Sequence, residues 1–63
     1  MTYVDLRPDN TRPVQVLVDG SWHPGELLAY RQGAADLWIG YVRWSDTPGQ
    51  NRLGWFSQEV IRT

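Results

Sequence analysis

The hydrophobic and polar residues of this chain alternate with a period of two over much of its length. Valines at positions 14, 16 and 18 are separated by Gln15 and Leu17. Alternation of this kind is typical of a β-strand with one buried face. No segment combines the length and the 3.6-residue period of an α-helix, so the pattern predicts an all-β domain.

Residues that favour turns divide the chain into short strands. Asp19-Gly20 supplies the positive φ angles of a two-residue hairpin, and Pro48-Gly49 suits the two central positions of a type II turn. A further turn is predicted around Gly33, at 31–36. The strands are predicted at 2–6, 14–18, 22–30, 37–44 and 53–56, and a short one closes the chain at 61–62.

The predicted strand 22–30 is apolar on both of its sides. Simple alternation places Leu27 and Ala29 on one side, and Leu28 and Tyr30 on the other. We therefore expect other parts of the chain to cover both faces of this strand. Pro24 has no amide N–H to donate, so it belongs at a sheet edge or a bulge.

The segment 37–44 is the most aromatic part of the chain. Alternation places Trp38, Val42 and Trp44 on one face and Tyr41 and Arg43 on the other. A core this small cannot hold every ring, because overpacking costs about 1–3 kcal/mol per misfit. We expect Trp38 and Val42 in the core. The aromatic side chains expected at the surface are Trp22, Tyr41 and Trp44.

Three segments resemble parts of Tudor and Agenet domains, which are SH3-like barrels. Residues 16–27 resemble their opening hairpin, and residues 40–45 resemble a third strand that ends in an aromatic. Residues 55–62 resemble the common ending of such barrels, in which Ser57 can cap a one-turn 3₁₀ helix before a closing strand. The resemblance implies one domain, 1–63: an N-terminal strand and loop at 1–13, then a five-stranded antiparallel SH3-like barrel at 14–62.

Tudor domains bind methylated arginine or lysine in an aromatic cage, where a cation is attracted to the faces of the rings. The resemblance places Trp44 at a cage position and Trp22 one residue away from another. The next cage aromatic is missing, because the turn there reads Asp46-Thr47-Pro48-Gly49. The resemblance thus implies the barrel together with only part of a cage.

Composition narrows the classes of function. The 63-residue chain has a formal net charge of −1, and all six of its cations are arginines, without the basic stripe typical of nucleic-acid binding. There is no cysteine and only one histidine, His23, so we expect no metal site and no cofactor. No apolar run reaches the roughly 20 residues of a membrane span, and residues 1–9 lack a signal-peptide pattern. We expect a cytoplasmic protein without a membrane partner.

Exposed aromatic residues and arginines are the candidate chemistry, because these residue types anchor binding hot spots. The candidate binding residues are Trp22, Tyr41, Arg43 and Trp44, and no residue is predicted to be catalytic. We expect Arg43 to pair with Asp36 or Asp46. The sequence therefore predicts a non-catalytic module that binds a protein segment or another subunit, with a homo-oligomer left open.

Two other classes of function remain as alternatives. A nucleic-acid binder would stack bases on the same rings and place Arg31, Arg43 and Arg52 along the phosphates. A small oligomeric enzyme would pool an active site from several subunits, although we expect this chain not to be an enzyme. Salt-dependent binding of nucleic acid would favour the first alternative, and a symmetric multimer with a shared pore would favour the second.

Overall fold

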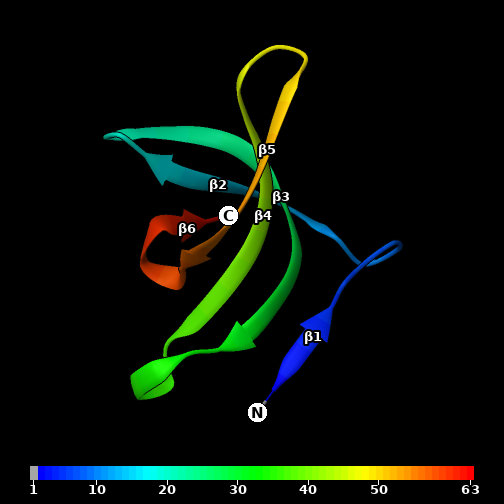
Figure 1. Cartoon of the computed structure of the whole chain (residues 1–63), viewed down its shortest axis with the longest axis vertical. Helices are drawn as coiled ribbons and strands as arrows, with labels where there is room; N and C mark the ends of the chain where they lie inside the picture. Colours follow the sequence, from blue (N-terminus) through cyan, green and yellow to red (C-terminus); the bar gives the residue numbers. More distant parts are fainter. Residues whose placement is uncertain (1) are drawn as a thin grey trace.

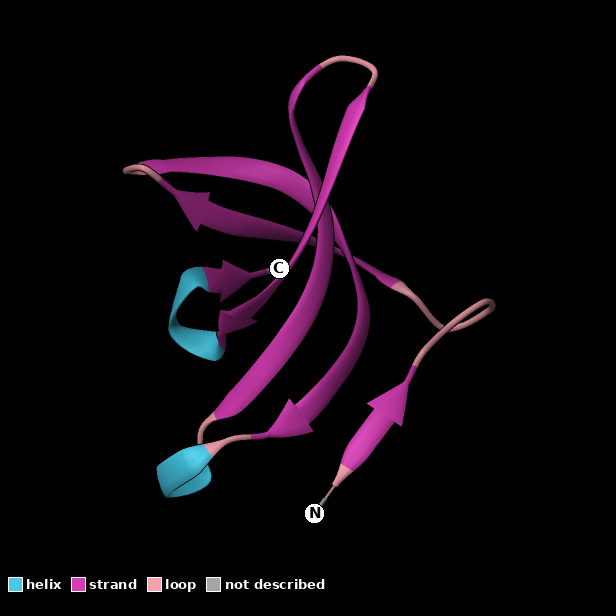
Figure 2. Ribbon diagram, viewed as in Figure 1, coloured by secondary structure: helices cyan, strands magenta, loops and turns pink. Residues whose placement is uncertain are grey.

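The computed structural model describes residues 2–63 as an antiparallel β-sheet with two short 3₁₀ helices (Figure 1, Figure 2). This arrangement confirms the predicted all-β class. The strands are β1 (Tyr3–Asp5), β2 (Arg12–Val18), β3 (Ser21–Gln32), β4 (Trp38–Thr47), β5 (Gln50–Ser57) and β6 (Ile61–Arg62). The 3₁₀ helices are η1 (Ala34–Asp36) and η2 (Gln58–Val60).

The sheet has six strands, in agreement with the N-terminal strand and the five further strands predicted, but it is not closed, which corrects the predicted barrel. The strand order is β5-β4-β3-β2-β6, so β5 and β6 lie at opposite ends. The sixth strand, β1, pairs with β3 at Tyr3↔Arg31, beyond the point where β2 begins at Arg12↔Leu27. Since β3 has 12 residues, it has room for two partners along one edge.

The predicted hairpins and the C-terminal cap are confirmed. Asp19 and Gly20 have φ angles of 51° and 81° and join the paired residues Val18 and Ser21. Gly49, with a φ of 84°, turns β4 into β5. The Ser57 hydroxyl accepts a hydrogen bond from the Glu59 N–H at 3.4 Å and begins η2. The predicted turn 31–36 starts later, because β3 continues to Gln32 before η1.

The main core lies on the inner face of the sheet, where β6 folds back against β2 (Figure 1). Its fully buried members are Val16 and Val42, in line with the prediction for Val42. Val14 and Trp44 complete the cluster, against which lie the partly buried Val18, Leu27, Phe56 and Ile61. The alternating valines of β2 therefore supply much of this core.

Two tryptophans on the inner face exchange their predicted environments. Trp44 was expected at the surface, but only 9% of it is exposed, because its ring packs against His23 and Phe56. Trp38 was expected in the core, but 38% of it is exposed. Trp38 begins β4, beyond the stretch covered by β2 and β6. Alternation identifies the face on which a residue lies, and coverage along the strand decides whether it is buried.

Strand β3 is covered on both faces, as predicted, but its simple alternation is broken. The register against β4 shifts between Leu27 and Ala29, so Leu28 is the extra residue of a β-bulge. Leu28 is buried, and its carbonyl accepts the N–H of Leu6 at 2.9 Å in the segment after β1. The bulge places Tyr30, instead of Ala29, on the same face as Leu27, which corrects the predicted sidedness of this strand.

No helix within residues 2–63 is long and apolar enough to cross a membrane. Both helices are single 3₁₀ turns of three residues each. The first joins the neighbouring strands β3 and β4, and the second joins β5 to β6 (Figure 2). The surfaces of the domain are therefore built almost entirely from strands.

Candidate functional site

The outer face of the sheet carries the largest group of exposed apolar side chains. Tyr3 is 50% exposed, Trp55 is 42% exposed and Leu53 is 57% exposed. Cross-strand pairing gathers these residues, because Tyr41 on β4 lies opposite Trp55 on β5, and Tyr3 on β1 lies opposite Arg31 on β3. We call the surface formed by Tyr3, Arg31, Tyr41 and Trp55 the Tyr–Trp face.

The rings of the Tyr–Trp face contact one another around Trp55. The Tyr41 ring lies 4.9 Å from the Trp55 ring between centroids, and the Tyr3 ring lies 6.3 Å from it. Both pairs are tilted, in the range that aromatic pairs favour. The N-terminal strand β1 and the β4–β5 hairpin thus place their rings in one patch.

Two arginines lie over the rings of this patch. The Arg31 guanidinium is 5.0 Å from the centre of the Trp55 ring, and the Arg7 guanidinium is 5.9 Å from the centre of the Tyr41 ring. Cation–π contacts of this kind are worth about 0.5–1 kcal/mol at exposed sites. Within residues 2–63 Arg31 forms no ion pair, so its charge remains available to a partner.

Arg7, by contrast, is held by an acidic neighbour. Its Nε lies 3.0 Å from Asp5 Oδ1, and its Nη2 lies 3.0 Å from Asp5 Oδ2. The Arg7 backbone N–H also donates to Asp5 Oδ1 at 3.0 Å. These bonds lower the pKa of the Asp5 carboxyl from its usual value of 3.8, the side-chain bond to Arg7 being the largest cause. The ion pair with Asp5 therefore restrains the Arg7 side chain at the edge of the patch, beside β1.

Arg43, a predicted binding residue, is exposed and lies on the outer face beside this patch. The sequence predicts an ion pair between Arg43 and Asp36 or Asp46, and this prediction is wrong. Arg43 pairs instead with Glu26, its cross-strand partner. Glu26 also accepts a hydrogen bond from the Thr11 hydroxyl at 2.6 Å. A hollow of about 500 Å³ lies next to this pair, lined by Arg7, Pro8, Thr11, Glu26, Leu28, Arg43 and Leu53.

The structure does not bring the predicted aromatic site together on one face. Tyr41 belongs to the Tyr–Trp face, whereas Trp44 is buried on the inner face. Trp22 is half-buried near the β2–β3 hairpin, with the Arg62 guanidinium 4.0 Å from the centre of its ring. Trp22 and Trp44 therefore have different neighbours, and the Trp44 ring is occupied by core packing.

Sequence reasoning missed the role of Trp55 because of an irregularity in the β4–β5 hairpin. Thr47 pairs with Gln50 across the turn, and a regular ladder from that pair would place Trp55 opposite Val42 on the inner face. A register shift between Trp44 and Thr47 instead pairs Trp55 with Tyr41. Pro48-Gly49 indicates the turn in the sequence, but no neighbouring residue indicates that the β4–β5 register shifts.

The remaining acidic residues and His23 of the described part of the chain lie apart from one another. No group of three His, Asp or Glu side chains lies close enough to hold a metal ion there. The His23 ring lies 5.3 Å from the Trp44 ring and contributes to the edge of the core. The arrangement favours recognition by rings and arginines.

No family model, curated protein or solved structure matches this chain. The functional reading therefore depends on the geometry of the residues themselves.

Proposed function

We propose that this chain is a non-catalytic binding module that docks a segment of another protein on its Tyr–Trp face. The observation that carries the proposal is the cluster of Tyr3, Tyr41 and Trp55, which remains accessible although its rings contact one another. Aromatic residues and arginine dominate the hot spots of protein interfaces. Rings already held by their neighbours lose little conformational entropy when a partner binds.

The strand order supports the SH3-like part of this proposal. In the five strands after β1, the meander β2-β3-β4-β5 is followed by η2, and β6 returns to pair with β2. This connectivity agrees with the SH3-like resemblance found in the sequence, although the sheet remains open. Under this proposal the domain is an SH3-like fold of the Tudor and Agenet type that uses its outer face, because Trp44 is buried at the cage position.

The charges on the outer face favour a segment with an acidic side chain. Arg31, which forms no ion pair within residues 2–63, lies against the Trp55 ring, around which the tyrosines of the patch gather. The two carboxylates nearby, Asp5 and Glu26, are already engaged by Arg7 and Arg43. A carboxylate beside an apolar residue in the partner would pair with Arg31 while the apolar side chain packs on the rings.

A nucleic-acid partner is the second candidate, because the patch combines rings with an arginine. Base stacking needs open ring faces, whereas Arg31 and Tyr41 both approach the ring of Trp55. The net charge of −1 adds nothing to phosphate binding. A protein segment is therefore the partner that we favour.

The proposal is tested by selecting peptides from a random displayed library against the whole chain. Peptides that bind the Tyr–Trp face should carry an acidic residue next to an apolar or aromatic one. Truncating Trp55 to alanine should weaken them by about tenfold or more, as expected for a hot-spot ring. Trp22→Ala is the matched control, because Trp22 is also an indole under an arginine but lies outside the patch.

Three results would contradict this assignment. Equal loss of peptide binding in the Trp55 and Trp22 variants would remove the Tyr–Trp face as the site. Tight, steeply salt-dependent binding of oligo(dT) without peptide binding would support the nucleic-acid alternative. A multimer in solution that dissociates in the Trp55→Ala variant would support a subunit interface at the Tyr–Trp face, including that of an enzyme with a pooled active site.

A further inference from the structure

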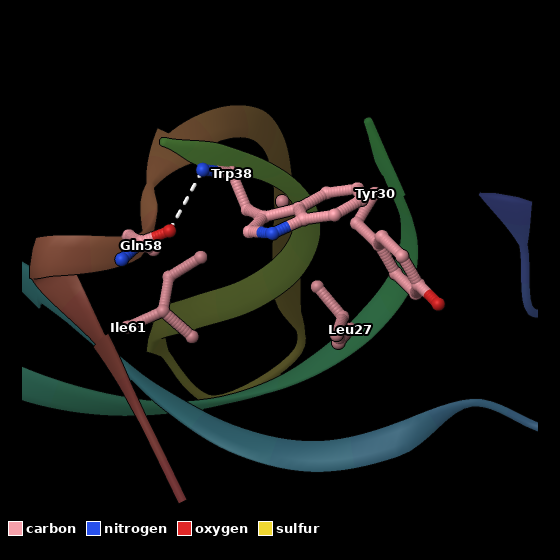
Figure 3. Close-up of a pocket in the computed structure, with 6 residues that line it drawn as sticks. Leu27, Tyr30, Trp38, Gln58 and Ile61 are labelled. Carbon is pink, nitrogen blue, oxygen red and sulfur yellow. Dashed lines mark hydrogen bonds between the residues drawn. The ribbon is translucent and has the colours of Figure 1, made fainter. Parts of the chain in front are cut away.

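An apolar cleft lies on the inner side of the sheet, away from the Tyr–Trp face. It is formed where the ends of β3 and β4 meet η2 and β6 (Figure 3), and it has a volume of about 410 Å³. Its lining contains no charged residue and consists of Leu27, Tyr30, Trp38, Gly40, Gln58 and Ile61. Sites for small organic molecules usually have volumes of about 300–1,000 Å³ and mostly apolar walls.

The β-bulge at Leu28 and the glycine at position 40 create this cleft. The bulge brings Leu27 and Tyr30 to the same face of β3. Gly40 lies at the base, where a Cβ atom would be 2.7 Å from Leu27 Cδ1 and 2.8 Å from Ile61 Cδ1. The absence of a side chain at Gly40 therefore allows Leu27 and Ile61 to approach each other and form one wall.

The opposite wall is aromatic. The Trp38 ring meets the Tyr30 ring edge-on, with centroids 5.2 Å apart and an interplanar angle of 79°. Figure 3 shows the indole of Trp38 on one side of the cleft and the aliphatic ends of Leu27 and Ile61 on the other. A flat ring placed between them would contact the indole on one side and aliphatic carbon on the other, an arrangement suited to aromatic packing.

The polar groups at the cleft offer hydrogen-bond donors. The Trp38 backbone N–H donates to Gln58 Oε1 at 2.7 Å, which occupies that acceptor and fixes the side-chain amide. Within residues 2–63 the Trp38 indole N–H has no acceptor, and Figure 3 shows its nitrogen on the ring edge that faces Leu27 and Ile61. The Gln58 NH₂ group is a second donor at the rim. An occupant with an acceptor would therefore match the cleft.

We propose that this cleft binds a small, uncharged, planar aromatic molecule that carries a hydrogen-bond acceptor. The ring would lie between Trp38 and the Leu27–Ile61 wall, and its acceptor would receive the indole N–H. A charged ligand is disfavoured, because no lining residue could compensate the cost of desolvating its charge. The cleft shares no lining residue with the Tyr–Trp face. The proposed small-molecule site can therefore be tested independently of the proposed protein partner.

Coumarin is a suitable probe, because it is flat, neutral and has a carbonyl acceptor. Titration into the whole chain labelled with ¹³C and ¹⁵N should shift the Trp38 indole N–H signal and the methyl signals of Leu27 and Ile61, with saturation. Trp38→Ala should raise the Kd by about tenfold or more, as expected when one wall of the cleft and its hydrogen-bond donor are removed together. Trp38→Phe, which retains an aromatic ring but removes the N–H, should give an intermediate Kd and guards against misfolding of the alanine variant.

Leu37→Ala is the matched control, because Leu37 precedes Trp38, is 37% exposed against 38%, and does not line the cleft. It should change the Kd for coumarin by about twofold at most. Trp55→Ala should leave the Kd equally unchanged, and coumarin-3-carboxylate should bind more weakly than coumarin. The proposal is overturned if Leu37→Ala weakens binding as much as Trp38→Ala. It is also overturned by shifts that centre on Trp55, or by shifts at all four indoles that do not saturate.

Discussion

Each face of β4 carries an aromatic side chain, but only the inner face is buried. On the inner face Val42 is fully buried and Trp44 is 9% exposed. On the outer face Tyr41 is half-buried and Arg43 is exposed. The difference arises outside β4: residues of β2 and β6 pack against its inner face, whereas Tyr3 of β1 and Arg7 lie at the rings of the outer face.

This comparison shows how a very small domain separates stability from recognition within one strand. A chain of this size can build only one thin core, since it buries only about 60% of the surface of its unfolded form. The rings that do not fit the core gather on the other face, where they remain available to a partner. Packing on the inner face and binding on the outer face can therefore be perturbed separately.

The largest expected effect separates Trp44 from Trp55. Trp44→Ala should lower the free energy of unfolding by about 3–5 kcal/mol, because it leaves a cavity between His23 and Phe56. That loss approaches the whole stability of about 3–5 kcal/mol expected for a core of this size. Trp55→Ala should cost about 1 kcal/mol, the value of a cross-strand pair. Urea unfolding followed by circular dichroism measures both.

The ratio of the two losses is the informative quantity. Similar losses for the two variants would show that the outer face contributes to folding as much as the inner one does. A stable Trp44→Ala protein would show that this ring is dispensable for the core and would restore the surface role predicted from the sequence.

An intermediate effect is expected where β3 and β4 approach each other on the inner face. A Cβ at Gly25 would lie 2.9 Å from the Arg43 carbonyl oxygen and 2.9 Å from Val42 Cγ1. Because the backbone carbonyl cannot move aside, Gly25→Ala should cost about 1–3 kcal/mol. The thermal unfolding midpoint should fall accordingly.

Gly54→Ala is the control for this prediction. A Cβ at Gly54 would meet only the Phe56 ring, at 3.2 Å, and alanine restricts the unfolded chain more than glycine does. Its unfolding midpoint should therefore change less than that of the Gly25 variant. A larger fall for the Gly54 variant than for the Gly25 variant would show that β3 and β4 can separate enough at Gly25 to accommodate a methyl group.

The smallest effect concerns the exposed ion pair at the edge of the outer face. The pKa of Asp5 is lowered from 3.8 in the folded chain by Arg7. The stability it contributes is therefore present above the unfolded pKa and is lost as pH falls through the lower folded value. A ¹³C titration of the Asp5 carboxyl should give a pKa below 3.8, and Arg7→Gln should return it toward that value. An unchanged pKa in the variant would show that Arg7 does not hold this carboxylate.

The local features were predictable because their causes are local. Asp19-Gly20 and Pro48-Gly49 adopt turns through the backbone freedom of their own residues. Ser57 caps η2 with its own hydroxyl. The period of two among the valines predicted the strand that supplies the inner core. Strands, hairpins and the closing turn could thus be located without knowledge of the tertiary structure.

The sequence by itself determined which residues form strands and where the chain reverses, because alternation and turn chemistry act between neighbours. Only the tertiary structure decided which ring is buried and which ring is free. Register shifts beside Leu28 and between Trp44 and Thr47 moved Tyr30 and Trp55 to other faces. Such shifts depend on how the whole sheet bends around one small core. The sequence of a single strand therefore does not indicate where they occur.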